Sequence, residues 1–189
     1  METSGGFEEL ARAALPRLYA LARRLTDEGP EDLVQECLLR AYRAFPTLED
    51  RAAGEAWLRR ILVNVFRDRL RREARSVDEV AVEDVEDFSL YRTLAEEDPF
   101  PYSDNLHLDF LHAFGREDIR AVLLRLPVLY RAPLVLRYIE GFSTKEIARL
   151  LDLPLGTVLA QLHRGRKRFE RELWVYANEV GLLAKGAQR

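Results

Sequence analysis

The chain has 189 residues, of which 48% are hydrophobic and 32% charged, and its formal net charge is −3. The apolar content excludes general disorder, and no uncharged apolar run approaches the roughly 20 residues that a bilayer span needs. One cysteine, Cys37, allows no internal disulfide, and His107, His112 and His163 lack the spacing of a metal motif. We therefore expect a cytoplasmic protein with no membrane contact, no metal and no cofactor.

The charges are distributed unevenly along the chain. Residues 1–75 hold 14 basic and 13 acidic side chains, residues 76–119 hold 2 and 13, and residues 120–189 hold 13 and 6. The three net charges are therefore +1, −11 and +7, so an acidic middle masks a basic C-terminal part. This asymmetry indicates an anionic partner for one end of the chain.

The N-terminal third is predicted to form three helices. Apolar residues recur at helical spacing over 7–26, where Pro16 predicts a break or a kink. Gly29 and Pro30 predict the end of this helix and the first turn of the next, which covers 31–45. A third helix over 54–73 is expected to pack inward through Trp57, Ile61, Leu62, Val65 and Leu70. Its other face carries Arg59, Arg60, Arg67, Arg71 and Arg72.

Residues 75–115 change character, because no helical period is sustained and acidic residues gather at 78–87 and 96–98. We interpret this segment as an acidic linker with one or two short helices, and a solvated disordered tether is the alternative. The expected fold class is all-α, with two small helical domains at 1–74 and 116–189.

The C-terminal part ends in a predicted helix-turn-helix. Ser143 and Glu146 form a capping-box pattern at the start of a short helix over 143–151, and Pro154 restarts the chain after a tight turn. The last helix, from about 154 to about 178, is expected to bury one apolar face. That face is formed by Leu155, Val158, Leu162, Phe169, Leu173 and Tyr176. On the face predicted to lie opposite are Thr157, Gln161, Arg164, Arg168 and Arg171, with Lys167 beside them.

This polar and basic face has two interpretations. It can enter the DNA major groove with its N-terminal residues against base edges, while arginines and lysines further along neutralise phosphates. Alternatively, it is a solvated face on an ordinary bundle helix. The capped helix before it and the charge contrast between the linker and the C-terminal part favour DNA.

Several stretches together resemble bacterial RNA polymerase sigma factors of the sigma-70 superfamily. The stretches are DLVQECLLRAYRAF, then AWLRRILVNVFRDRLRR, and near the C-terminus LPVLYRAPLVLRYIEGFSTKEIARLLDLPLGTVLAQLHRGRKRF. The small two-domain extracytoplasmic-function (ECF) group is the most similar. The resemblance covers about residues 7–73 and 116–178, with both domains in the order expected of that group.

The resemblance implies a factor that binds core RNA polymerase and directs it to promoters, not an enzyme. Helix 31–45 is expected to dock the clamp helices of the polymerase through Asp32, Gln35, Glu36 and Arg40. Helix 54–73 and loop 46–53 are expected to meet the −10 element and help to melt it. The candidate contacts are Trp57, Arg60, Asn64 and Arg67. A core position is favoured over base stacking for Trp57, and loop 46–53 is the expected site for an extruded base.

The second domain is expected to read the −35 element. Its candidate contacts are Thr157, Gln161, Arg164, Lys167, Arg168 and Arg171. The sequence departs from the family pattern at Leu159, Ala160 and Gln161, which puts the usual promoter motif in doubt, although Gln161 can read adenine bidentately. The resemblance further implies an anti-sigma factor as partner, a monomer when free, and a linker that runs through the polymerase toward the RNA path.

Three alternatives remain. A stand-alone helix-turn-helix regulator would bind duplex DNA without polymerase, as a dimer on a palindrome, but no dimerisation helix or ligand pocket is recognisable. An enzyme is disfavoured because the sequence has no Gly-rich phosphate loop, metalloprotease motif or nucleophile elbow. An anti-sigma or adaptor protein is disfavoured by the basic last helix.

Overall fold

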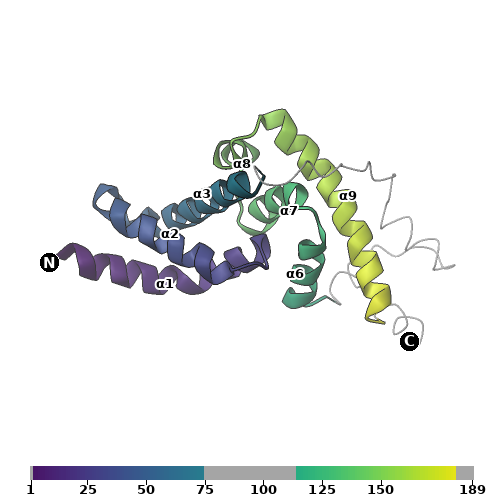
Figure 1. The fold of residues 1–189 in the computed structure, drawn as a ribbon, viewed down its shortest axis with the longest axis horizontal. Helices are drawn as coiled ribbons and strands as arrows, with labels where there is room; N and C mark the ends of the chain where they lie inside the picture. Colours follow the sequence, from purple (N-terminus) through teal and green to yellow (C-terminus); the bar gives the residue numbers. More distant parts are fainter. Residues whose placement is uncertain (1, 75–113, 182–189) are drawn as a thin grey trace. The chain divides into compact units, whose positions relative to one another are not determined.

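A computed structural model describes residues 2–74 and 114–181 of the chain (Figure 1). Within this part the protein is all-α, as predicted, and holds no strand. The α-helices are α1 (Glu2–Leu25), α2 (Pro30–Ala44), α3 (Gly54–Ala74), α6 (Arg116–Arg125), α7 (Val128–Leu134), α8 (Thr144–Leu151) and α9 (Leu155–Glu179). The predicted acidic linker lies outside the described residues from 75 to 113.

The described chain divides into two compact units. One contains α1, α2 and α3 together with Val135–Val158, and the other contains residues 114–134 and 159–181. No helix in the described ranges is both long enough and apolar enough to cross a bilayer.

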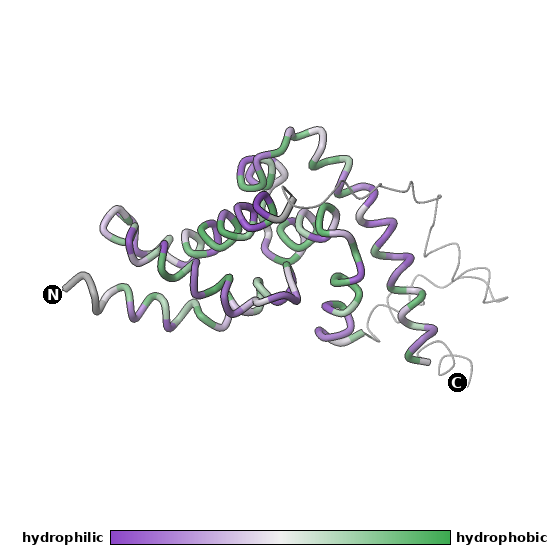
Figure 2. Tube along the Cα trace, in the orientation of Figure 1, coloured by the Kyte–Doolittle hydropathy of each residue, from purple (hydrophilic) through white to green (hydrophobic). Residues whose placement is uncertain are grey.

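In the first unit, α1, α2 and α3 pack together around a shared apolar core. Hydrophobic and hydrophilic residues alternate along each of these helices, as Figure 2 shows. The buried side chains include Leu18, Leu21, Leu25, Leu33, Cys37, Leu58, Leu62, Val65 and Phe66. Burying each large aliphatic side chain contributes about 1.5–3 kcal/mol, so this core accounts for how α2 and α3 are held against each other.

Two details of this unit differ from the sequence expectations. Helix α1 runs without a break through Pro16, which is exposed, so water can hydrate the carbonyl that loses its helical partner. On α3, Trp57, Ile61 and Leu70 are only half-buried. Leu58 and Phe66 are buried on this helix instead, together with Leu62 and Val65, which were expected to face inward.

The boundary between α1 and α2 confirms the expected turn. Gly29 adopts a left-handed conformation with φ of 57°, and Pro30 occupies the first turn of α2. A side chain is strained at such a φ, so glycine suits the position. After α2, the 3₁₀ turns η1 (Phe45–Thr47) and η2 (Arg51–Ala53) lead the chain into α3.

The second unit is held by contacts between α6, α7 and α9. Tyr176 on α9 donates its hydroxyl to Asp118 Oδ1 at 2.6 Å, and Arg125 Nη2 pairs with Glu179 Oε2 at 2.6 Å. Gly165 is buried where α9 passes α7, and an added Cβ would lie 3.2 Å from Leu134 Cδ1. Glycine therefore allows α9 and α7 to approach each other closely.

The predicted helix-turn-helix is formed by α8 and α9. Ser143 caps α8 by accepting from the Glu146 backbone N–H, and Glu146 accepts in return from the Ser143 N–H at 3.0 Å. At the other end, Asp152 adopts a left-handed conformation with φ of 55°, and the Leu153 N–H donates to the Ala148 carbonyl at 2.9 Å. These local bonds fix the turn between the two helices.

Candidate functional site

The exposed side of α2 carries two of the four residues predicted to bind polymerase. Asp32 and Gln35 are exposed, whereas Glu36 and Arg40 are half-buried at the edge of α2 that faces α3. Carboxylates in the first turn of a helix are stabilised by its dipole, which suits Asp32 at this position. The four predicted residues therefore occupy two adjoining strips of one helix.

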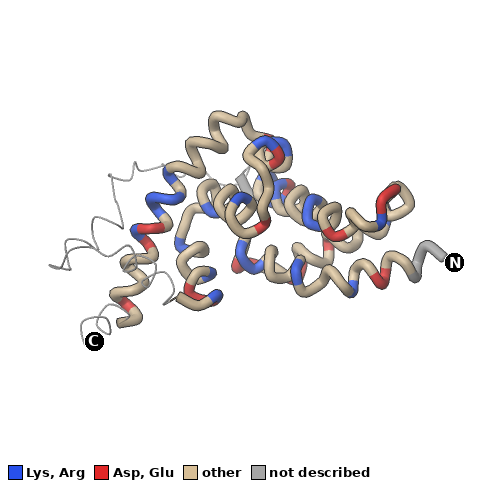
Figure 3. Tube along the Cα trace, turned by 180° about the vertical axis from the view of Figure 1, so that it is seen from behind, with Lys and Arg blue, Asp and Glu red and all other residues tan. Residues whose placement is uncertain are grey.

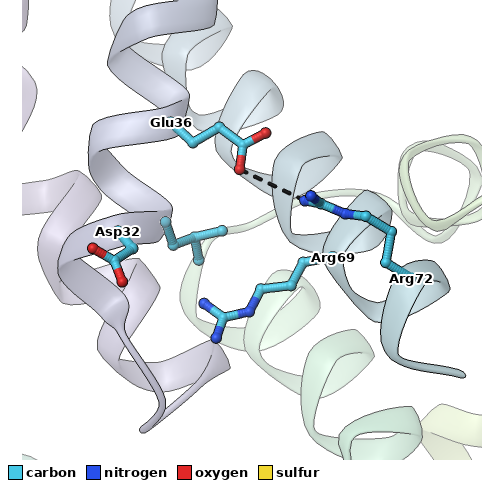
Figure 4. A pocket seen from close by; sticks show the side chains of 5 residues that line it. Asp32, Glu36, Arg69 and Arg72 are labelled. Atoms are coloured by element: carbon cyan, nitrogen blue, oxygen red, sulfur yellow. Dashed lines mark ion pairs between the residues drawn. The ribbon is translucent and has the colours of Figure 1, made fainter. Parts of the chain in front are cut away.

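A shallow hollow of about 360 Å³ opens between α2 and α3 beside these residues. Asp32, Leu33 and Glu36 of α2 line it on one side, and Arg69 and Arg72 of α3 line it on the other (Figure 4). Glu36 Oε2 lies 3.7 Å from Arg72 Nη2, and Arg69 Nη1 donates to the Gly29 carbonyl at 3.5 Å. The hollow thus presents carboxylates and guanidinium groups on facing sides.

A chain of ion pairs joins α2 to α3 next to the hollow. Arg40 donates to Glu36 Oε1 at 2.5 Å and to Asp68 Oδ2 at 2.7 Å. Asp68 also accepts at Oδ1 from Arg67 Nη2, at 3.0 Å. The hydrogen bond from Arg40 is the main cause that holds the pKa of Asp68 below its usual range, and the same bond raises the pKa of Arg40. Both groups therefore remain charged at neutral pH.

Sequence reasoning did not single out Asp68 or Arg69, although both belong to this surface. A signal existed, because Asp68 is the one acidic residue among six arginines between positions 59 and 72. A lone carboxylate in such a run is expected to pair with several of its neighbours. What the sequence could not give is the contact from Arg40, which lies on another helix.

The four residues predicted to meet the −10 element lie along α3, but they differ in their surroundings. Trp57 and Asn64 are half-buried. Arg60 is exposed and pairs with Glu146 Oε1 at 2.9 Å. Arg67 donates from Nη1 to the Leu150 carbonyl at 3.2 Å, in addition to its contact with Asp68. Two of the four are therefore already engaged by protein groups.

Other arginines of α3 also contact the segment from Glu140 to Asp152, which belongs to the same compact unit. Glu140, whose side chain is 7% exposed, pairs with Arg59 Nη1 at 3.2 Å. Arg59 also lies over the Phe142 ring, 5.6 Å from its centroid. Near the end of the helix, Arg71 pairs with Asp152. These carboxylates neutralise the arginine face of α3, so phosphate contacts there require the ion pairs to open.

Loop 46–53, expected to capture an extruded base, is largely exposed between η1 and η2. Thr47 Oγ1 donates to the Ala44 carbonyl at 2.7 Å, and Asp50 Oδ1 accepts from the Ala52 N–H at 2.9 Å. Arg51 lies over the Phe45 ring, 4.7 Å from its centroid. The loop therefore has local bonds that define its course and an exposed polar surface.

On α9 the predicted reading face is not directly opposite the buried stripe. Val158, Leu162, Gly165, Leu173 and Ala177 are buried. Relative to these positions, a turn of 100° per residue places Thr157, Gln161 and Arg168 on the flank, and all three are half-buried. Arg164 and Arg171 are exposed, and Leu155 is exposed rather than buried as expected.

Two of these flank residues have contacts that bear on DNA reading. Within the described residues, the Oε1 atom of Gln161 is buried and has no hydrogen-bond partner. The Arg168 guanidinium lies 5.5 Å from the centroid of the Tyr130 ring, which is buried. Figure 3 shows the basic residues gathered along the middle of α9. This part of α9 offers Arg164 and Arg171 outward and retains Arg168 near α7.

Family comparisons assign both halves of the chain. Residues 10–76 match the family described as Sigma-70 region 2, and residues 116–169 match the family described as Sigma-70, region 4. The region 2 match includes α2 and α3, and the region 4 match includes α8 and the first part of α9.

Curated relatives cover most of the chain. The RNA polymerase sigma-E factor of Streptomyces coelicolor is 33% identical over 88% of this chain and 85% of its own length. The ECF RNA polymerase sigma factor SigW of Bacillus subtilis is 28% identical over 88% of each protein. The ECF RNA polymerase sigma factor SigE of Mycolicibacterium smegmatis is 37% identical over 94% of this chain, which spans 65% of that longer relative.

A solved structure shares the fold. It is the sigma factor RpoE in complex with the anti-sigma factor NepR from Bartonella quintana, with a TM-score of 0.58. The match covers 89% of this chain and 97% of that chain, at 24% sequence identity. At this identity the likeness concerns the fold alone.

Proposed function

Because the chain belongs to the ECF group of sigma-70 RNA polymerase sigma factors, we propose that it binds core RNA polymerase and directs it to specific promoters. One observation carries this proposal: a region 2 segment and a region 4 segment follow each other in one chain, and each presents polar or basic residues outward. The role is that of a binding factor without enzymatic activity.

The polymerase is proposed to dock on α2. Exposed Asp32 and Gln35 supply the outer contacts, and the hollow beside them supplies Arg69 and Arg72 from α3. A surface with both signs of charge selects a partner with the complementary pattern, which favours specificity and a fast association rate. Clamp helices that carry both acidic and basic residues would fit this hollow.

Promoter DNA is proposed to contact both segments. The −10 element would meet α3 and loop 46–53, where exposed polar groups surround a short, locally bonded turn. The −35 element would meet α9, with Arg164 near base edges and Arg171 against phosphates. For Lys167, Arg168, Thr157 and Gln161, we retain the predicted DNA contacts as proposals.

We further propose that the two domains cover residues 1–74 and 116–189. We also propose that the free chain is a monomer and that an anti-sigma factor binds it. The support for such a partner is the similar solved structure from Bartonella quintana, in which a sigma factor is bound to an anti-sigma factor. A basic, solvent-facing α9 and an exposed α2 would be the surfaces that such a protein must cover to prevent transcription.

The test is the affinity of the full chain for core polymerase. Asp32→Ala combined with Gln35→Ala should weaken core binding without unfolding the protein, because exposed substitutions usually change stability by under about 0.5 kcal/mol. Glu8→Ala combined with Arg12→Ala is the matched control. These two exposed α1 residues form an i,i+4 ion pair, with 2.8 Å between Arg12 Nη2 and Glu8 Oε1, and neither residue lines the hollow. Equal core affinity in both double variants would contradict the α2 assignment.

The same preparations separate the alternative function. A stand-alone helix-turn-helix regulator would shift promoter DNA in a gel without polymerase and would be unaffected by the α2 substitutions. A sigma factor would give a promoter-specific complex only when core polymerase is present.

A further inference from the structure

Asp68 joins the two binding surfaces of the first unit. Its carboxylate lies on α3 with 33% of the side chain exposed, and each oxygen accepts from a different arginine. Oδ2 is 2.7 Å from Arg40 Nη1, whereas Oδ1 is 3.0 Å from Arg67 Nη2 and 3.3 Å from Arg67 Nε. Arg40 belongs to the proposed polymerase face, and Arg67 belongs to the proposed −10 face.

The network around Asp68 closes on itself. Arg40 also holds Glu36 at 2.5 Å, and Glu36 faces Arg72 at 3.7 Å. Arg72 Nε in turn donates to the backbone carbonyl of Asp68 at 3.4 Å. Two arginines and two acidic residues thus connect α2 and α3 in a ring. Arg67 lies outside this ring and joins it through Asp68, which is the one group that contacts both proposed faces.

The contact between Arg67 and Asp68 is unusual for a helix. Side chains at i and i+1 point in directions about 100° apart, so neighbouring residues do not normally pair. The helical neighbours that Arg67 could reach at i±3 and i±4 are Val63, Asn64, Leu70 and Arg71, and none is acidic. Asp68 is therefore the acceptor that orients the Arg67 guanidinium within its own helix, while Nη1 contacts the Leu150 carbonyl at 3.2 Å.

We propose that Asp68 is a positioning residue that orients Arg40 for polymerase and Arg67 for promoter DNA, so that one carboxylate supports both binding steps. The inference rests on the proposed function. A part-exposed ion pair contributes little to folding. An arginine that is already held in its binding orientation loses less conformational freedom on binding, and this is expected to change an affinity by about 3- to 10-fold.

The experiment uses the full chain, core polymerase from the host bacterium and a promoter fragment recovered by run-off transcription. Asp68→Asn keeps the size of the side chain but removes its charge. It should weaken core binding about 3- to 10-fold and weaken promoter binding by the assembled holoenzyme about 3- to 10-fold. Asp68→Glu should recover part of both losses, because it restores the carboxylate.

Double variants distinguish positioning from a structural role. In an Arg67→Ala background, Asp68→Asn should cause no further loss of promoter affinity. In an Arg40→Ala background, it should cause no further loss of core affinity. Val63→Ala is the control for stability, because Val63 is fully buried in α3 and its apolar side chain cannot take part in the ion-pair network. It should lower the melting temperature and leave both affinities unchanged.

Three results would count against the positioning role of Asp68. Unchanged affinities in Asp68→Asn, additive losses in the double variants, or losses matched by Val63→Ala would overturn the positioning role. If the wild-type chain itself fails to bind core polymerase, the proposed function fails and this inference fails with it. If the wild-type chain binds core polymerase and Asp68→Asn binds core polymerase and promoter DNA as tightly as the wild type, the proposed function stands and this inference is rejected.

Discussion

Two glycines of α9 allow the packing of this helix to be tested with the same substitution at matched sites. A Cβ at Gly165 would lie 3.2 Å from Leu134 Cδ1 and 3.3 Å from Tyr130 Cβ, on the adjacent helix α7. A Cβ at Gly156 would meet no heavy atom within 4 Å. Gly165 is buried and Gly156 is exposed, so any difference between the two alanine variants reports the contact between α9 and α7.

The two alanine variants are expected to change the free energy of unfolding in opposite directions. Alanine is favoured over glycine within a helix by up to about 1 kcal/mol, and at Gly156 near the helix start we expect a gain of about 0.5 kcal/mol. At Gly165 the same gain is opposed by overpacking, which costs about 1–3 kcal/mol when neighbours must move. Leu134 can shift its side chain, but Tyr130 Cβ is attached directly to the backbone of α7. Gly165→Ala is therefore expected to lose about 1 kcal/mol, which separates the two variants by about 1.5 kcal/mol.

Urea denaturation of the full chain, followed by far-UV circular dichroism, measures this difference. Promoter binding by the holoenzyme should fall with Gly165→Ala if α9 is displaced, whereas core binding through α2 should remain. Equal stabilities of Gly156→Ala and Gly165→Ala, or a more stable Gly165→Ala, would refute the close packing of α9 on α7.

Three further predictions concern single residues. Ser143→Ala removes the α8 cap and should cost about 1 kcal/mol of unfolding free energy, measured by thermal melting; an unchanged melting temperature would speak against the cap. In the holoenzyme, Arg164→Ala should cost about 1–3 kcal/mol on the best promoter and relax base preference, whereas Arg171→Ala should reduce the salt slope of binding by about one. The reverse pattern would contradict their assignment. Burial raises the pKa of Cys37 from 9.0 to about 12. Because the thiol pKa is higher in the folded than in the unfolded chain, the free energy of unfolding should be constant below pH 9.0 and should fall as the pH rises toward 12. Cys37→Ala should remove this dependence on pH. An identical pH profile in the variant would exclude the thiol as its source.

The helices could be predicted because their signals are local. Gly29 with Pro30 marks the boundary of α1 and α2, and Ser143 with Glu146 marks the start of α8. In each case the residues that determine the geometry lie within a few positions of one another. The fold class and the helix-turn-helix follow from such signals together with the 3.6-residue period.

The rotation of each helix could not be predicted, because it depends on what packs against it. On α3 the pattern was compatible with an inward Trp57, but Leu58 and Phe66 are buried and Trp57 is half-buried. On α9 the close approach to α7 places Gly165 in the buried stripe, and Gln161 and Arg168 lie on the flank of that stripe. A glycine gives no hydrophobic signal, so this approach is visible only in three dimensions.

Part of the candidate site followed from the sequence, since motif matching placed Asp32 and Gln35 on a helix face that is exposed in the structure. The ion-pair network was missed because its members come from separate helices. Arg40 and Asp68 are 28 residues apart, and no spacing rule relates them. The ion pairs of α3 arginines with Glu140 and Glu146 were missed for the same reason, because only the tertiary fold brings these residues together.

Run-off transcription with core polymerase on a genomic fragment library tests the proposed function most completely. The full chain should produce transcripts from a limited set of fragments that share paired upstream elements, and omission of the chain should abolish them. Transcription that is independent of the chain, or specific DNA binding by the chain without polymerase and no transcripts with it, would contradict its role as a sigma factor.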